Sequence, residues 1–170
     1  EDSAKIPMIL VPHTERNDIG HNKQDDRLAA HADIFPTLLD LCDIPSPSTV
    51  EGHSLVGETT RETLYGEHWE NIHASRMIVE KQYKLIYYPI GNKSQLFDLQ
   101  NDPDEMQNLA GDPAYSDVLT RLTNDLINKL YGTDLEWLDG NKLVGLKEDK
   151  DTPVEPLDRG LGGQRGLRFR

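Results

Sequence analysis

The sequence contains a single cysteine, Cys42, among its 170 residues, which excludes an internal disulfide framework. Aromatic residues make up only 6% of the chain and hydrophobic residues 36%. This is a lean supply for a self-sufficient core, but it is well above the composition of a disordered segment. No apolar run approaches the roughly 20 residues that a membrane helix needs, and no signal peptide is visible. The composition therefore predicts one folded, domain-sized segment and leaves the compartment open.

Basic residues are also scarce, because 18 Lys and Arg stand against 30 Asp and Glu, a formal net charge of -12. An acidic chain repels phosphate groups. We therefore expect no nucleic-acid partner and no docking on anionic membranes.

The first 45 residues have the pattern of an α/β domain. The continuously apolar run at residues 5–12 predicts a strand buried on both faces, as in a parallel sheet. Asp33 is placed to cap a helix over residues 34–41, with Pro36 in the first turn. Since parallel strands need partners, residues 1–45 are predicted to be the C-terminal end of a larger α/β domain, cut at the N-terminus. One helix face would carry Phe35, Leu38, Leu39 and Cys42, so Cys42 is predicted to be buried.

A different pattern follows the Pro- and Ser-rich connector at residues 44–48. Short strands are predicted at residues 63–68, 77–80, 83–88 and 95–99, and Gly91-Asn92 marks a hairpin between the last two. Consecutive strands with loops of hairpin length predict an antiparallel sheet.

Helical patterns return after the sheet. Residues 102–105 and the pair Asp112-Pro113 both have the form of a helix N-terminus. An amphipathic helix is predicted from Tyr115 to Leu130, ended by Gly132 and covering one face of the sheet. Residues 46–132 would thus form a sheet-plus-helix subdomain, and residues 133–170 an extended, irregular tail. The Gly-rich, basic end at residues 159–170 predicts either disorder or an arm that docks on the acidic body or on a partner subunit of a homo-oligomer.

Several phrases, in order along the chain, resemble the sulfatase family and in particular its bacterial arylsulfatase branch. The resemblance is carried by DDRL at residues 25–28, HADIFPTLLDLCDIP at 31–45, VEGHSL at 50–55, YGEH at 65–68, YKLIY at 83–87, QLFDLQNDPDE at 95–105, NLA at 108–110, LYG at 130–132 and GQRG at 163–166. Each phrase alone is weak, but their collinearity over nearly the whole chain is specific. The resemblance implies an alkaline-phosphatase-like α/β fold, with a C-terminal subdomain of four antiparallel strands packed on a long helix.

The resemblance also implies a chemistry that these residues do not supply. Sulfatases use a formylglycine made from Cys or Ser in a C/S-x-P/A-x-R context, a bound Ca²⁺ and Lys and His partners, all in the large N-terminal domain. Cys42 is followed by Asp43-Ile44-Pro45, so the Pro is one position late and no Arg follows. Asp25-Asp26 is interpreted as a solvated or salt-bridged turn rather than a metal site. The chain is therefore predicted to be the C-terminal portion of a sulfatase, inactive alone, with its nucleophile and Ca²⁺ ligands outside this chain.

Candidate substrate-binding residues are His68, Glu67 and His13. His13, like His21, lies in the loop after the predicted buried strand, where open α/β sheets place their active sites. His68 ends a predicted strand in Tyr-Gly-Glu-His, which the resemblance puts near the mouth of the catalytic cleft. Glu67 is expected to point away from His68, so at most one of them faces the cleft. The competing interpretation is a structural His–Glu pair.

Three functions remain open from the sequence. The first is part of a sulfuric ester hydrolase acting on a small-molecule or saccharide sulfate, with the missing N-terminal catalytic domain as its partner. The second is part of a phosphonate or phosphodiester hydrolase of the same superfamily. The third is a non-catalytic binding module that offers a sheet face and an arm. A C/S-x-P/A-x-R segment upstream in the reading frame would favour the first.

Overall fold

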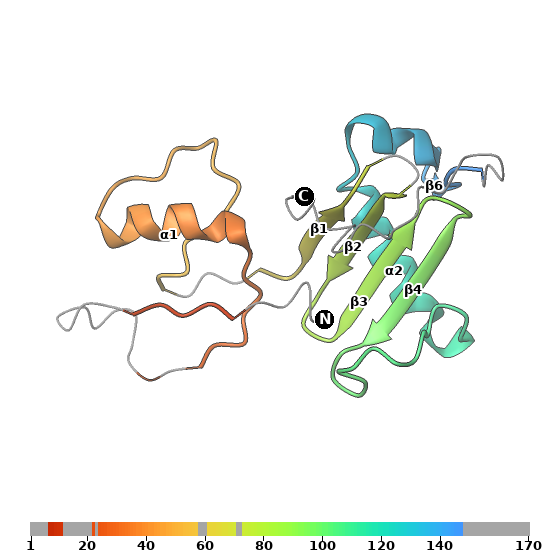
Figure 1. Ribbon diagram of the computed structural model, residues 1–170, viewed down its shortest axis with the longest axis horizontal. Helices are drawn as coiled ribbons and strands as arrows, with labels where there is room; N and C mark the ends of the chain where they lie inside the picture. Colours follow the sequence, from red (N-terminus) through yellow and green to blue (C-terminus); the bar gives the residue numbers. More distant parts are fainter. Residues whose placement is uncertain (1–6, 12–21, 23, 58–60, 71–72, 148–170) are drawn as a thin grey trace, which may run out of the picture. The chain divides into compact units, whose positions relative to one another are not determined.

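The computed structural model describes residues 7–11, 22, 24–57, 61–70 and 73–147, and the chain divides into two compact units, Glu1–Leu64 and Tyr65–Arg170 (Figure 1). The division falls later than the boundary predicted at residues 45–46. The reason is that His53, Leu55 and Arg61 are hydrogen-bonded back to Asp33 and Thr37 and so belong to the first unit.

The first unit is built around one helix. A short 3-10 turn, η1 (His31–Asp33), leads into α1 (Ile34–Leu41), which confirms the predicted helix. Pro36 lies in the first turn, where its missing N–H costs no intrahelical bond. Asp33 occupies the N-cap position of α1 but does not cap that helix, because its carboxylate accepts the amide of Ala30 at 2.7 Å and closes η1 instead.

Apolar side chains in this unit are widely exposed. Phe35 and Leu38 on α1 are each 54% exposed, and Ile9 and Val11 are each 84% exposed. Residues 7–11 form no strand, because no described segment pairs with them. Cys42 is exposed, so the prediction that it is a buried residue is wrong. The face of α1 that was expected to be core has no covering element among the described residues.

The second unit is a four-stranded sheet in the order β1-β2-β3-β4, formed by β1 (Leu64–His68), β2 (Ser75–Val79), β3 (Tyr83–Tyr88) and β4 (Lys93–Asp98). The pairs β2–β3 and β3–β4 are antiparallel, with Ile78 opposite Leu85 and Leu85 opposite Leu96. The helix α2 (Ser116–Ile127) lies across one face of the sheet (Figure 1). The predicted sheet-plus-helix arrangement is confirmed.

Alternation along the strands places the core between the sheet and α2. The central strand residues that point to α2 are fully buried, as are the helix residues Leu122 and Leu126 that meet them. The principal members of this core are Ile78, Leu85, Tyr87, Leu96, Leu122, Leu126 and Trp137. Burial of each of these side chains contributes about 1.5–3 kcal/mol relative to exposure.

The helix predicted at residues 102–105 does not form. The carboxylate of Asp98 accepts the amides of Gln100 and Asn101, at 3.0 and 3.1 Å, and closes a turn there. Glu105 then adopts a φ of 55°, which no right-handed helix accommodates. The second helix signal is confirmed, since the Asp112 carboxylate accepts the amide of Ala114 at 2.9 Å ahead of η3 (Pro113–Tyr115) and α2.

The region predicted to be irregular after residue 132 is ordered as far as residue 147. It forms η4 (Gly132–Trp137) and a two-stranded hairpin of β5 (Leu138–Asp139) and β6 (Lys142–Leu143). Trp137 enters the core and anchors this segment. α2 ends at Ile127, three residues before the predicted end, although Leu130 still packs in the core. The predicted arm at residues 159–170 lies outside the described residues.

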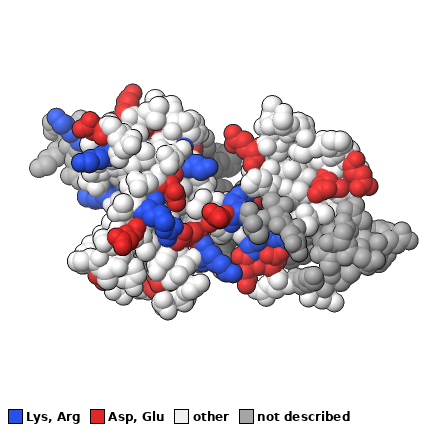
Figure 2. Space-filling model, turned by 180° about the vertical axis from the view of Figure 1, so that it is seen from behind, with Lys and Arg blue, Asp and Glu red and all other residues white. Residues whose placement is uncertain are grey.

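The charge distribution agrees with the composition. On the face drawn in Figure 2, the Lys and Arg side chains lie among Asp and Glu side chains. None of the helices in the described residues combines the length and the apolar character that crossing a bilayer requires.

Replacement of a core residue tests this packing. Leu126→Ala removes a fully buried side chain of α2, so we expect it to lower the free energy of unfolding by about 2–5 kcal/mol, through lost transfer energy and a residual cavity. Leu135→Ala is the matched control, because Leu135 is 52% exposed; its cost is expected to stay near 0.5 kcal/mol. Urea unfolding of both variants measures the difference, and equal costs would contradict the core as described.

Candidate functional site at the end of strand β1

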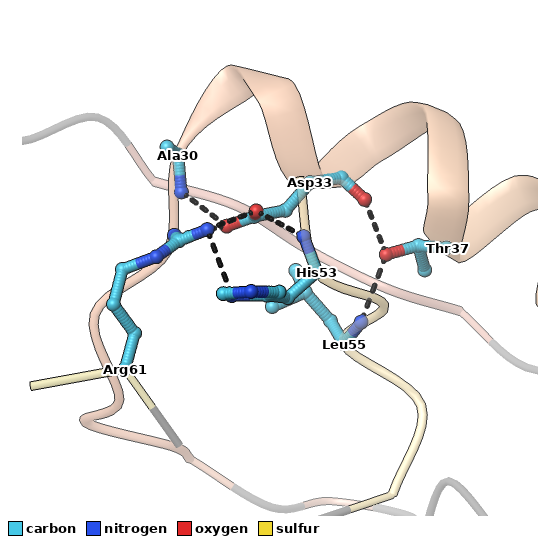
Figure 3. Close-up of polar contacts among 6 residues, drawn as sticks. All are labelled: Ala30, Asp33, Thr37, His53, Leu55 and Arg61. Atoms are coloured by element: carbon cyan, nitrogen blue, oxygen red, sulfur yellow. Dashed lines mark hydrogen bonds and ion pairs between the residues drawn. The ribbon is translucent and has the colours of Figure 1, made fainter. Parts of the chain in front are cut away.

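A cluster of polar side chains surrounds Asp33 in the first unit (Figure 3). The Asp33 carboxylate is fully buried and receives both outer nitrogens of the Arg61 guanidinium, at 2.6 and 2.7 Å. It also accepts the backbone amides of Ala30 and His53, at 2.7 and 2.8 Å. Burial alone would raise the pKa of Asp33, but these donors and the positive charge of Arg61 hold it below its usual value.

Two further contacts extend this cluster. The Thr37 hydroxyl donates to the Asp33 carbonyl at 2.5 Å and accepts the Leu55 amide at 2.9 Å. Nδ1 of His53 lies 3.2 Å from an Arg61 nitrogen. A guanidinium can only donate, so in this contact Nδ1 would be the acceptor. Both carboxylate oxygens of Asp33 therefore have hydrogen-bond donors. The cluster holds His53, Leu55 and Arg61 against Asp33 and Thr37, and its carboxylate is not available to bind a ligand.

The candidate site lies in the second unit, where β1 ends. Side chains alternate along the strand, so Tyr65 and Glu67 share one face while Gly66 and His68 share the other. Tyr65 packs against the core beneath α2. A hydrogen bond to Glu67 and the charge of this carboxylate raise the pKa of Tyr131, so Glu67 is engaged on the Tyr65 side of the sheet.

His68 lies on the opposite face from Glu67. Partial burial lowers the pKa of His68, so its imidazole is neutral at pH 7 and presents one N–H donor and one acceptor nitrogen. A Cβ at Gly66 would lie only 2.6 Å from the Met77 methyl carbon. The absence of a side chain at Gly66 therefore leaves room for the Met77 side chain of β2.

The end of β1 is held by a buried ion pair that sequence reasoning missed. Nε and Nη2 of Arg76 donate to the two Asp134 carboxylate oxygens, at 2.6 and 2.9 Å. Nη1 donates to the carbonyls of Trp69 and Ser75, at 2.9 and 3.0 Å. The guanidinium carbon also lies 5.1 Å from the centre of the Trp137 ring. Burial alone would lower the pKa of Arg76, but the Asp134 carboxylate raises it, so the cation persists.

An aromatic group completes this corner. Trp69 follows β1 with a φ of 58°, in the left-handed region that favours glycine. Its ring makes T-shaped contacts with His68 and His73, with ring centres 6.2 and 5.3 Å apart. No sequence signal marked these residues as a group, because the Trp69 backbone is bonded to Arg76, whose own position depends on the distant Asp134.

Of the other residues singled out from the sequence, His13 and His21 lie outside the described residues. Asp25 forms an ion pair with Arg27 at 2.5 Å, as expected for a salt-bridged turn. Within the described part of the chain, no three His, Cys, Asp or Glu side chains come together so that they could hold a metal ion. These residues therefore do not fit the Ca²⁺ that the resemblance implies, and no chemical step is derived through it.

Comparison with known proteins identifies the family. Residues 1–131 match the model of the N-sulphoglucosamine sulphohydrolase C-terminal family. This chain belongs to that family, and the sulfatase resemblance of its sequence is confirmed.

Individual relatives extend this result. The chain is 33% identical over 163 residues to an arylsulfatase of Clostridium perfringens, covering 92% of this chain and 33% of the relative. It is 34% identical over 161 residues to a Delta 4,5-hexuronate-2-O-sulfatase of Bacteroides thetaiotaomicron, covering 80% of this chain and 31% of the relative. The solved phosphonate monoester hydrolase of Agrobacterium radiobacter shares the fold alone. Its TM-score is 0.51 and its sequence identity 24%, and the match covers 66% of this chain and 27% of the hydrolase chain. The predicted α/β fold class is confirmed, and the chain spans about a third of the length of these sulfatases.

The buried Asp33–Arg61 pair predicts a local stability effect. Arg61→Met would leave the Asp33 carboxylate buried without its cation, which costs about 3–5 kcal/mol. We expect thermolysin to cleave near Leu55 about 100-fold faster or more, because the rate of proteolysis follows the fraction of molecules in which the segment around Leu55 is open. Arg121→Met is the control, because it removes an exposed bidentate pair with Glu80, worth about 0–1 kcal/mol. Equal cleavage rates at Leu55 in both variants would refute the role of Arg61.

Proposed function

We propose that this chain is the C-terminal part of a sulfuric ester hydrolase acting on sulfated saccharides, and that the nucleophile and the metal site belong to a preceding catalytic domain. The observation that carries the proposal is the family match over residues 1–131. Relatives named as an arylsulfatase and a hexuronate sulfatase support the sulfate-ester and saccharide parts of the proposal. The Ca²⁺ expected for a sulfatase is assigned in this proposal to residues outside this chain.

The exposed apolar surface of the first unit supports a covalently attached neighbour. Ile34, Phe35 and Leu38 lie side by side on α1, and residues 8–11 expose four more large apolar side chains. Contiguous apolar surface of this kind is rarely left in water and marks an interface. We propose that α1 and residues 7–11 complete the sheet of the catalytic α/β domain, and that the second unit is the antiparallel subdomain that follows it.

The chemistry of sulfate-ester hydrolysis assigns a limited role to this chain. A nucleophile must attack sulfur, positive charge and N–H donors must hold the sulfate oxygens, and an acid must protonate the leaving group. Cys42 has no Arg behind it and lies outside the formylglycine context. We therefore propose a binding role, in which the neutral imidazole of His68 donates its N–H to a sulfate oxygen or to the leaving-group oxygen.

The other two candidate residues are weighed differently. Glu67 interacts with Tyr131 on the face opposite His68, which favours a structural role for Glu67 and supports His68 as the proposed substrate contact. His13 stays a proposed substrate-binding residue, on its position after the apolar run at residues 5–12 alone.

A phosphonate monoester hydrolase is the second candidate, favoured by the shared fold of the Agrobacterium radiobacter enzyme. Sulfate and phosphonate monoesters present similar tetrahedral groups. In this proposal, the residues that would discriminate between the two substrates belong to the preceding catalytic domain and not to this chain. The two candidates are separated by assaying the product of the complete reading frame on a sulfated disaccharide and on a phosphonate monoester. Preference for the phosphonate would replace the first proposal.

The isolated 170-residue chain is expected to hydrolyse no sulfate ester. It has no residue in a formylglycine context, and the proposal assigns the Ca²⁺ ligands to another domain. The measurement is turnover of an aryl sulfate by the purified chain with added Ca²⁺, beside the product of the complete reading frame as positive control. Turnover by the chain that survives repurification would overturn the assignment of catalysis to the preceding domain.

Replacement of His68 in the complete enzyme tests the binding role. If the imidazole donates a hydrogen bond in the transition state, His68→Ala should lower kcat/KM by an amount equivalent to about 2–4 kcal/mol while the melting temperature changes little. His31→Ala is the control, because His31 is an exposed histidine of the first unit. A value of kcat/KM within about threefold of wild type, with a lowered melting temperature, would make His68 a packing residue.

A further inference from the structure

The corner at the end of β1 is built with more constraint than a surface turn requires. Trp69 is a bulky residue held at a φ of 58°, a conformation that persists only where surrounding contacts enforce it. The enforcing contact is the bond from Arg76 Nη1 to the Trp69 carbonyl, at 2.9 Å. Arg76 is itself 4% exposed and fixed by Asp134. Backbone strain maintained by a buried ion pair is characteristic of functional sites.

Three rings, those of His68, Trp69 and His73, lie together at this corner. Trp69 is half-buried, whereas His68 and His73 are exposed on either side of it in sequence. Both imidazoles meet the indole ring in T-shaped contacts, at ring-centre distances of 6.2 and 5.3 Å. The corner therefore combines one large, oriented aromatic surface with N–H groups that can donate hydrogen bonds.

This combination fits the chemistry of a sugar ring. A pyranose has apolar C–H faces whose slightly positive hydrogens are attracted to the negative face of an aromatic ring, and a rim of hydroxyl or sulfate oxygens that accept hydrogen bonds. Binding sites for such ligands place a few polar donors around an aromatic surface. A simple anion, in contrast, would need cationic groups, and the Arg76 guanidinium beside this corner is buried and bonded to Asp134 and to the Trp69 carbonyl.

We propose that Trp69 is a specificity-determining residue that packs against the pyranose ring of the sulfated saccharide, while His73 donates a hydrogen bond to an oxygen on that ring. This inference rests on the proposed sulfatase function and adds to it the residue that binds the organic part of the substrate. Arg76 and Asp134 act as positioning residues, since they hold the Trp69 backbone and do not reach the surface.

The test uses the enzyme produced from the complete reading frame, with a sulfated disaccharide as substrate and inorganic sulfate as a competitive inhibitor. Trp69→Ala is expected to raise KM for the disaccharide by about tenfold or more, in line with the loss of one stacked ring, with kcat nearly unchanged. The inhibition constant of inorganic sulfate should not change, because sulfate has no sugar ring. Trp69→Phe, which keeps an aromatic face, should recover most of the affinity.

Two further variants separate binding from folding. Trp69→Gly removes the ring and also relieves the left-handed strain, so this variant should be at least as stable as Trp69→Ala. Its KM for the disaccharide should rise as much as that of Trp69→Ala. Tyr115→Ala is the matched control, because Tyr115 is a half-buried ring in a T-shaped contact with Tyr83, outside the β1 corner. It should leave KM within about twofold of wild type.

The outcomes distinguish this inference from the proposed function. Hydrolysis of the disaccharide with an unchanged KM in Trp69→Ala would overturn the role of Trp69 and leave the sulfatase assignment intact. A KM that rises equally in Tyr115→Ala would also overturn it, since the effect would then be one of stability. Hydrolysis of a phosphonate monoester and of no sulfated saccharide would overturn both.

Discussion

The end of β1 and the turn that follows it depend on the buried ion pair between Arg76 and Asp134. Removing two charges from water costs several kcal/mol per ion, and this cost is offset only when the geometry is good and the remaining donors are satisfied. Here the guanidinium makes two bonds to the carboxylate and two short bonds to carbonyls, and packs over the Trp137 ring. The pair joins positions 58 residues apart, so the end of β1, β2 and η4 form or fail together.

The first unit repeats the same physical solution with different elements. Asp33 is fully buried, and Arg61, 28 positions later, supplies the counter-charge while two backbone amides complete its coordination. In both units a buried Arg–carboxylate pair helps to hold an irregular segment, and in the second unit it acts together with the packing of Trp137 in the core. This suits a chain with 6% aromatic and 36% hydrophobic residues, because such a composition leaves little apolar surface with which to hold loops.

The sequence predicted best where local pattern decides the structure. β3 and α1 were predicted with their observed bounds, because an apolar strand pattern and an Asp–Pro helix start are local signals. The helix start predicted at residues 102–105 does not form, because the carboxylate of Asp98, outside the motif, accepts backbone amides and closes a turn there. Cys42 was misplaced because the burial of a helix face depends on what covers it. At the candidate site, His68 could be predicted from its strand end, but Trp69 could not, since its backbone is held by Arg76, which is in turn fixed by Asp134, 58 positions further on.

A C-terminal region without a nucleophile can still affect catalysis. Binding energy from parts of a substrate that do not react positions the reacting group, and an enzyme uses that energy best when the contact is rigid before the substrate arrives. A contact residue on a mobile loop would have to be ordered during binding, and that entropy would be lost from affinity. Trp69 is already fixed, since its backbone is bonded to a guanidinium that cannot move without breaking the Asp134 pair. The proposed saccharide contact therefore depends on the buried ion pair of Arg76 and Asp134, which fixes the backbone of Trp69 before a substrate binds.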